Sequence, residues 1–144
     1  MNVSIVLPED YERIWSHIND YMEGAARYTH GRFTCEDIKQ GLINNNLQQL
    51  WIAYEDDKAY GAVITEILEY PRMRTLIMHF TGGIELPKWK DDMLALLRRF
   101  AKDHGCKTIE SFGRTGWKRV FKNDGFKSKF MFYELSVEGK SNEI

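Results

Sequence analysis

The stretch "FTGGIELPKWKDDMLALLRRFAKDHG", residues 80–105, carries the clearest fold signal in the chain. Its apolar residues recur at intervals of three and four, which places one buried stripe along a helix. The stripe consists of Trp89, Met93, Leu96, Leu97 and Phe100. Gly105 is a residue type that commonly follows the end of a helix. Because a glycine turn before a helix is also a common phosphate site, Gly82 and Gly83 raise the question of a phosphate-containing ligand.

The bulk composition is typical of one globular domain. The chain has 144 residues, of which 43% are hydrophobic and 28% charged, so it is long enough to bury its own core. A net charge of −1 creates no overall field that would attract nucleic acid or an acidic membrane. No apolar run approaches the ~18 residues that a membrane span requires.

Cysteine usage favours a reducing compartment. Cys35 and Cys106 are the only cysteines, and the N-terminal residues lack the pattern of a secretory signal. Free thiols are favoured over a single disulfide. We therefore expect a cytoplasmic location.

The apolar pattern predicts alternating strands and helices joined by short connections. Strands are expected at 3–7, 47–55, 58–70, 74–80, 106–112 and 126–137, the last as one strand or a pair. Helices are expected at 8–26, 34–46, 87–105 and 114–125. The helix at 34–46 should open with a capping box, since Thr34 is followed three residues later by Asp37.

This order predicts the class of the fold. Adjacent strands in the first half suit antiparallel pairing, while the strand–helix–strand crossover from 74 to 112 requires parallel strands. We therefore expect an α/β fold with a mixed, mostly antiparallel central sheet and helices on both faces. A single domain should cover 1–137, followed by a polar tail at 138–144.

The element order resembles that of the GCN5-related N-acetyltransferases (GNAT) over residues 3–137. The most specific piece is "GRTGWKRVFKNDGF", residues 113–126. Members of the family carry a short helix here that ends in a Tyr, three further residues and Gly-Phe, and Phe121 stands in place of the Tyr. The "GR-x-GW" motif also resembles small GNAT-like proteins encoded by tailed phages, some of which are virion components.

The resemblance implies a cofactor and a place for it. Acetyl-coenzyme A would lie in a split between the fourth and fifth strands. Its diphosphate would be held by backbone N–H groups of a glycine-rich loop that opens the third helix. The corresponding segment, "ELPKWK" at 85–90, has no glycine, and Pro87 lacks an N–H while Glu85 adds negative charge. We therefore expect no cofactor. If the chain is active, acetyl-coenzyme A would be held by the following residues: Gly82, Gly83, Lys88 and Lys90.

The resemblance also implies an acid and a base. Because Phe121 has no proton to donate to a departing thiolate, Tyr133 is the substitute candidate. His79 and Glu66 are candidates for the base that removes the proton of a small-molecule amine acceptor. Glu69 is a further candidate, but it lies three residues from Glu66, so only one of the two can face the site in a regular strand.

The sequence also bears on two other kinds of site. The four histidines show no metal-ligand spacing, so no metal is expected. A basic, aromatic patch would suit nucleic acid or an acidic protein surface, although the same residues also suit the solvent face of a helix. The patch consists of Arg114, Trp117, Lys118, Arg119 and Lys122.

The sequence thus supports two functional hypotheses. The favoured one is a non-catalytic GNAT-fold protein of the phage type, a structural, assembly or binding protein associated with the virion. Its partners would be other protein subunits, such as phage structural proteins, with neither membrane nor nucleic acid favoured. The alternative is an acetyl-coenzyme A-dependent N-acetyltransferase with a divergent cofactor loop.

Overall fold

The computed structural model describes residues 1–112, 121 and 123–138. The chain divides into two compact units, Met1–Phe112 and Gly113–Ile144. The strands of the first unit are β1 (Asn2–Val6), β2 (Gln48–Glu55), β3 (Lys58–Glu69), β4 (Arg74–Gly83) and β5 (Thr108–Ser111). Its helices are α1 (Tyr11–Ala26), α2 (Cys35–Asn44) and α3 (Lys90–Asp103), with short 3-10 turns η1 (Pro8–Asp10) and η2 (Leu86–Lys88).

The five strands form one mixed sheet. Their spatial order is β1-β2-β3-β4-β5, the same as their order in the chain. Strands β1 to β4 pair antiparallel with one another in sequence, and β5 pairs parallel with β4 after the crossover through α3. The predicted mixed, mostly antiparallel sheet is therefore confirmed.

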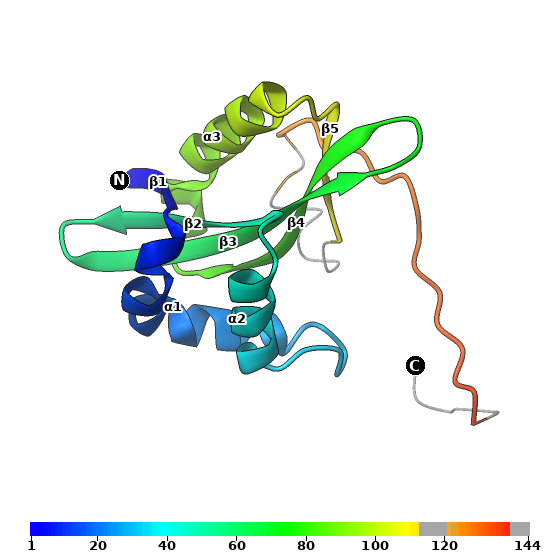
Figure 1. Cartoon of the computed structure of the whole chain (residues 1–144), viewed down its shortest axis with the longest axis horizontal. Helices are drawn as coiled ribbons and strands as arrows, with labels where there is room; N and C mark the ends of the chain where they lie inside the picture. The colour runs from blue at the N-terminus through cyan, green and yellow to red at the C-terminus, as the bar shows by residue number, and fades with distance from the viewer. Residues whose placement is uncertain (113–120, 122, 139–144) are drawn as a thin grey trace. The chain divides into compact units, whose positions relative to one another are not determined.

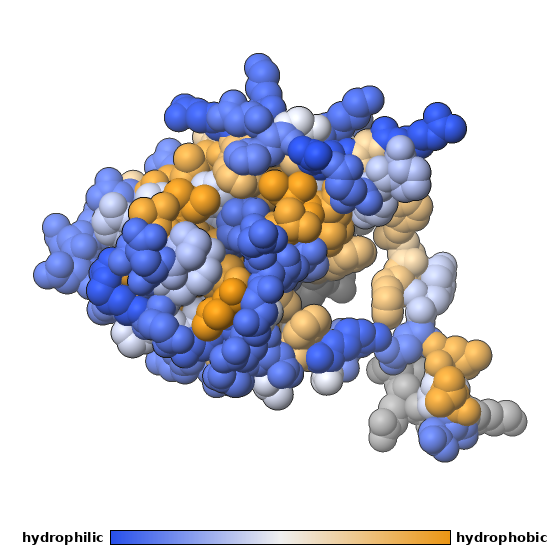
Figure 2. All heavy atoms as spheres, viewed as in Figure 1, coloured by the Kyte–Doolittle hydropathy of each residue, from blue (hydrophilic) through white to orange (hydrophobic). Residues whose placement is uncertain are grey.

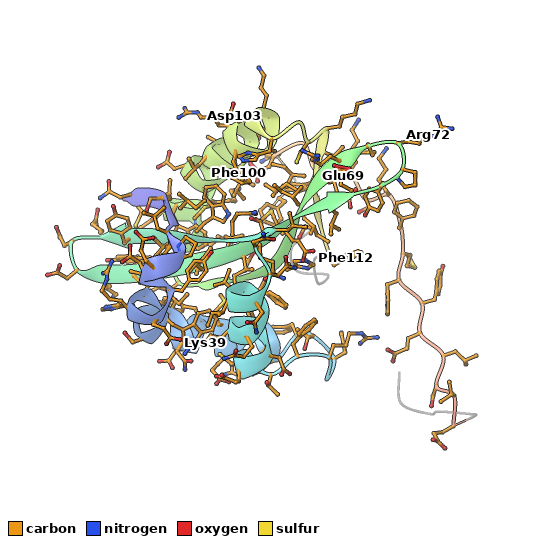
Figure 3. The ribbon with its side chains drawn as sticks, in the orientation of Figure 1. Lys39, Glu69, Arg72, Phe100, Asp103 and Phe112 are labelled. Atoms are coloured by element: carbon orange, nitrogen blue, oxygen red, sulfur yellow. The ribbon has the colours of Figure 1, made fainter. Side chains whose placement is uncertain are left out.

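Helices cover both faces of the sheet, as expected (Figure 1). Helices α1 and α2 lie over one face and contribute Trp15, Ile18, Met22, Ile38 and Leu42 to a buried apolar cluster that includes strand residues. Helix α3 lies over the other face, where Phe100 meets the ring of Trp51 edge-on at a centroid distance of 5.0 Å (Figure 3). Side chains alternate along β2, so Leu50 and Ile52 point toward the cluster with α1 and α2 while Trp51 points toward α3.

The helix starts follow local sequence signals. The Thr34 side chain accepts from the N–H of Asp37 at 3.1 Å, and the Asp37 carboxylate accepts from the N–H of Thr34 at 2.9 Å. The predicted capping box is therefore confirmed. Pro8 does not open α1 itself; it opens η1, and the α-helix begins at Tyr11.

One irregularity in β4 decides which side chains share a face. The register pairs Thr65 with Met78 and Ile64 with Phe80, so His79 is an extra residue opposite the junction of Ile64 and Thr65. A β-bulge of this kind lets two successive side chains point to the same side. His79 and Phe80 therefore both face α1 and α2.

A second feature anchors α3 to the sheet. Trp89, at the N-cap of α3, is buried, and its indole nitrogen donates to the carbonyl of Ile84 at 2.9 Å. A Cβ placed on Gly61 would lie 2.3 Å from Cζ2 of Trp89, and one on Gly83 would lie 3.1 Å from the same atom. The indole thus fills the space that two glycines leave empty.

The C-terminal unit differs from the sequence-based expectation. The described residues 123–138 contain no helix or strand, so the strand expected at 126–137 is wrong for this structure. A strand requires ladder partners for its backbone groups, and alternating apolar residues do not supply them by themselves. The helix expected at 114–125 falls mostly outside the described residues.

Figure 2 shows hydrophilic residues over most of the visible face, with apolar residues in small groups between them. Among the described residues, no helix combines the length and apolar character needed to cross a membrane.

The packing of Trp89 against Gly61 predicts a strong effect of one added methyl group. Gly61→Ala should lower the free energy of unfolding by about 1–3 kcal/mol, because the indole has to shift within a packed layer. Gly24→Ala is the matched control, since nothing lies within 4 Å of a Cβ there and alanine favours the helix. Urea denaturation measures both variants; equal stabilities would contradict the packing argument.

The capping box predicts a pH-dependent contribution to stability. Hydrogen bonds from the backbone and side chain of Thr34 lower the pKa of Asp37. A lowered folded-state pKa stabilises the fold above the unfolded-state pKa, and this contribution is lost as the pH falls through the folded-state value. Asp37→Asn should therefore be less stable than the parent at pH 7, with the difference shrinking below about pH 4. Thermal unfolding of both proteins across this pH range tests the prediction. A difference in stability that stays constant with pH would contradict it.

Candidate functional site

A hydrogen-bonded triad lies where β3, β4 and the start of β2 meet. Nε2 of His79 lies 2.9 Å from Oε1 of Glu66, and Nε2 of Gln48 donates to the same oxygen at 3.1 Å. The side chains of His79 and Glu66 are 28% and 17% exposed, so the pair is partly shielded yet open to solvent. Since a carboxylate only accepts hydrogen bonds, Nε2 of His79 is the donor and Nδ1 of the neutral ring keeps its lone pair.

The sheet register explains how these residues meet. Glu66 lies opposite Gln48 on one side and opposite Ile77 on the other, which makes His79 its diagonal neighbour two residues along β4. A long side chain spans this diagonal distance. The sequence analysis named His79 and Glu66 separately, and the structure brings them together.

Aromatic rings lie next to the triad on the same side of the sheet. Phe80 follows His79 at the bulge, with ring centroids 5.7 Å apart. Phe33, in the connection between α1 and α2, meets Phe80 edge-on at 5.2 Å. The α1–α2 connection therefore brings an apolar wall to the triad.

The other proposed catalytic residues lie elsewhere. Glu69 is at the far end of β3, in the β3–β4 hairpin, where its carboxylate pairs with Arg74 (Figure 3). Tyr133 is 83% exposed and belongs to the second unit, so its reaching the triad stays a prediction.

Beside the triad, β4 and β5 stop pairing. Their parallel register runs from Thr75–Thr108 to Met78–Ser111, one residue before His79. From His79 to Gly83, β4 continues with β3 on one edge and no β5 partner among the described residues on the other. An extended molecule with amide groups can hydrogen-bond to such a strand edge.

The connection from β4 to α3 is built differently from a phosphate loop. Gly82 and Gly83 belong to β4, where they pair with Ala62 and Gly61. A Cβ on Gly82 would lie 2.2 Å from the carbonyl oxygen of Tyr21 in α1. Protein atoms therefore fill the space beside both glycines.

Three backbone N–H groups of this connection bond to carbonyls of the protein. The N–H of Ile84 donates to Tyr60 at 2.8 Å, that of Lys88 to Glu85 at 2.9 Å and that of Trp89 to Leu86 at 3.1 Å. Glu85 adopts the left-handed conformation at φ 52°, and Pro87 has no N–H to offer.

Charge in the connection does not favour an anion. Residues 84–92 carry three carboxylates against two lysines. Lys88 pairs with Glu85 at 2.7 Å, and Lys90 lies 4.0 Å from Asp91. The interaction between Glu85 and Lys88 lowers the pKa of the carboxyl and raises that of the ammonium. Asp91 and Asp92 also occupy the first turn of α3, where their charge offsets the helix dipole. The connection thus does not fit a nucleotide diphosphate.

Further kinds of site were considered among the described residues. No three His, Cys, Asp or Glu side chains lie close enough there to hold a metal. Both cysteines are free thiols, and burial raises the pKa of Cys35 to about 11 and also raises the pKa of Cys106. Neither is therefore an activated nucleophile. The basic, aromatic patch from Arg114 to Lys122 lies outside the described residues apart from position 121.

Sequence analysis missed Gln48. No motif singles out a glutamine at the first position of β2, and its role depends on being opposite Glu66. Its other amide atom, Oε1, is buried and has no hydrogen-bond partner among the residues that the structure describes. Such an atom normally bonds to water or to a ligand.

Searches of the sequence against protein-family models and against curated proteins found no match. The structure, in contrast, matches solved acetyltransferases over nearly their whole length. A predicted acetyltransferase from Clostridium acetobutylicum, solved with acetyl-CoA, has a TM-score of 0.72 at 17% identity, covering 95% of this chain and 96% of that one. A ribosomal-protein-alanine N-acetyltransferase from Brucella melitensis biovar Abortus has a TM-score of 0.67 at 12% identity, covering 94% and 99%.

An aminoglycoside N-acetyltransferase in complex with CoA matches at a TM-score of 0.69 and 13% identity, covering 93% of each chain. Identities this low establish the fold and not the activity. The phage-type and virion expectations receive no support from these matches. The sheet order, the crossover through α3 and these matches together show that the chain has the GNAT acetyltransferase fold.

Proposed function

We propose that the chain is an N-acyltransferase that moves an acyl group from a thioester to an amine. The observation that carries this proposal is the contact of His79 with Glu66 at 2.9 Å, beside the point where β4 and β5 stop pairing. It places a group that can accept a proton next to the part of β4 that has no β5 partner among the described residues, where a thioester arm would lie. The acetyltransferase neighbours support the same class of reaction.

Each member of the triad has a distinct role in this proposal. Nδ1 of His79 takes the proton of the acceptor amine as its nitrogen attacks the acyl carbon. A C–N bond forms, the C–S bond breaks and the thiolate departs with the electron pair of that bond. Glu66 holds the ring orientation and stabilises the imidazolium, while Gln48 holds the carboxylate in place. The last two are positioning residues.

A non-catalytic binding or assembly protein is the second candidate. The observation that favours it is the connection before α3, with its three carboxylates and its lack of a backbone cradle. This candidate predicts no thiol release with any thioester. The comparisons support the acyltransferase proposal better, because the matched neighbours are acetyltransferases.

His79→Ala tests the proposed base. With a thioester and a panel of amines, thiol release should fall by about 10²–10⁴-fold, because the variant lacks the imidazole nitrogen that is proposed to accept the proton. Added imidazole should restore part of the rate. His17→Ala, at an exposed position of α1, is the control and should retain the parent rate. Full activity in His79→Ala would refute the proposed role.

Glu66→Gln tests the positioning of His79. The amide keeps the size of the side chain but cannot stabilise an imidazolium, so kcat should fall by about 10²-fold or more while KM for the donor stays the same. Glu69→Gln is the matched control on the same strand and should match the parent. A fall in kcat of similar size in both variants would indicate a general effect on β3 instead.

A further inference from the structure

We propose that this chain recognises its acyl donor through the thioester arm and not through a nucleotide diphosphate. The inference rests on the proposed acyltransferase function and specifies the donor, which is an acyl thioester of the pantetheine type. Three observations support it, and each concerns the connection from β4 to α3 or the strand edge beside it.

The first observation is the charge at the start of α3. A helix N-terminus attracts anions because its first N–H groups point outward and its dipole is positive there. In this chain Asp91 and Asp92 occupy that first turn, and Glu85 precedes it. A diphosphate with at least two negative charges would meet three carboxylates within eight residues of chain.

The second observation is that Trp89 and three bonded N–H groups occupy the connection before α3. Trp89 fills the gap over Gly61 and Gly83, and its indole N–H bonds to Ile84. The amides of Ile84, Lys88 and Trp89 bond to carbonyls of the protein. A diphosphate could use these three N–H groups only by breaking the bonds that they already make.

The third observation is the edge of β4 from His79 to Gly83. No β5 residue pairs with this segment among the described residues, whereas β3 holds its other edge in register. A pantetheine arm is extended and contains two amide groups, so it can bond to such an edge as a further strand would. An arm that runs along this edge carries its thioester to His79.

The first experiment compares two donors with one acceptor amine. Rates of thiol release are measured with acetyl-CoA and with acetyl-pantetheine, which lacks the nucleotide diphosphate. The values of kcat/KM should agree within about 5-fold, since the diphosphate contributes little binding. A preference for acetyl-CoA above about 50-fold would overturn the inference while leaving the acyltransferase proposal intact.

Binding measurements decide the inference even if neither donor reacts. Calorimetric titration with CoA and with pantetheine should give dissociation constants within about 5-fold of each other. 3′-Phosphoadenosine 5′-diphosphate, which is the nucleotide part of CoA with its diphosphate and without the arm, should not compete. Absence of transfer together with equal binding would refute the acyltransferase proposal alone. Absence of pantetheine binding, or competition by the nucleotide, would refute the inference.

A charge variant adds a test that a purely structural effect would not reproduce. Asp91→Asn combined with Asp92→Asn removes two negative charges at the start of α3, so kcat/KM for acetyl-CoA should rise by about 3–10-fold relative to acetyl-pantetheine. Asp103→Asn, at the other end of the same helix, is the matched control and should leave the ratio unchanged. An unchanged ratio in the double variant would show that these carboxylates do not repel the nucleotide.

Discussion

The packing of Trp89 against Gly61 and Gly83 is the constraint on which the rest of the first unit depends. The indole replaces side chains that two neighbouring strands lack, and its N–H bonds to Ile84 in the connection that follows β4. The position of the indole decides where α3 begins, because Trp89 is also the N-cap of that helix. The same packing fixes the turn from Glu85 to Lys88. The contacts that hold α3 on the sheet are therefore the same contacts that disfavour diphosphate binding at the segment between β4 and α3.

The bulge in β4 is a second constraint, independent of the first. Without the extra residue, strict alternation would point Phe80 away from the side that His79 occupies. With it, His79 meets Glu66 and Phe80 meets Phe33 on one face. Pairing of β4 with β5 ends one residue before His79 among the described residues. The two side-chain contacts on this face thus follow from one irregularity in one strand.

These two constraints also show how far the sequence could predict the structure. Helix periodicity, the capping box of Thr34 and Asp37 and the strand–helix–strand crossover are local patterns, and they predicted the order of elements through β5. The bulge at His79 is not a local pattern, since "IMHF" contains no glycine and depends on the register with β3. The same holds for Gln48, whose role depends on lying opposite Glu66. At 126–137 the strand pattern was present, but a pattern does not supply the ladder that a strand requires.

The connection before α3 and the triad concern different parts of the proposed reaction. Remote contacts that bind substrate and transition state equally raise KM when they are lost and leave kcat unchanged. A proton acceptor acts only as the amine attacks, so its loss lowers kcat. The connection before α3 therefore argues against tight binding of a nucleotide carrier, and it does not argue against the chemistry. To infer a non-catalytic protein from the missing loop is to treat weaker donor binding as a loss of catalysis. The contact of His79 with Glu66, which sequence analysis could not establish, supports the proposed chemistry independently of how the donor binds.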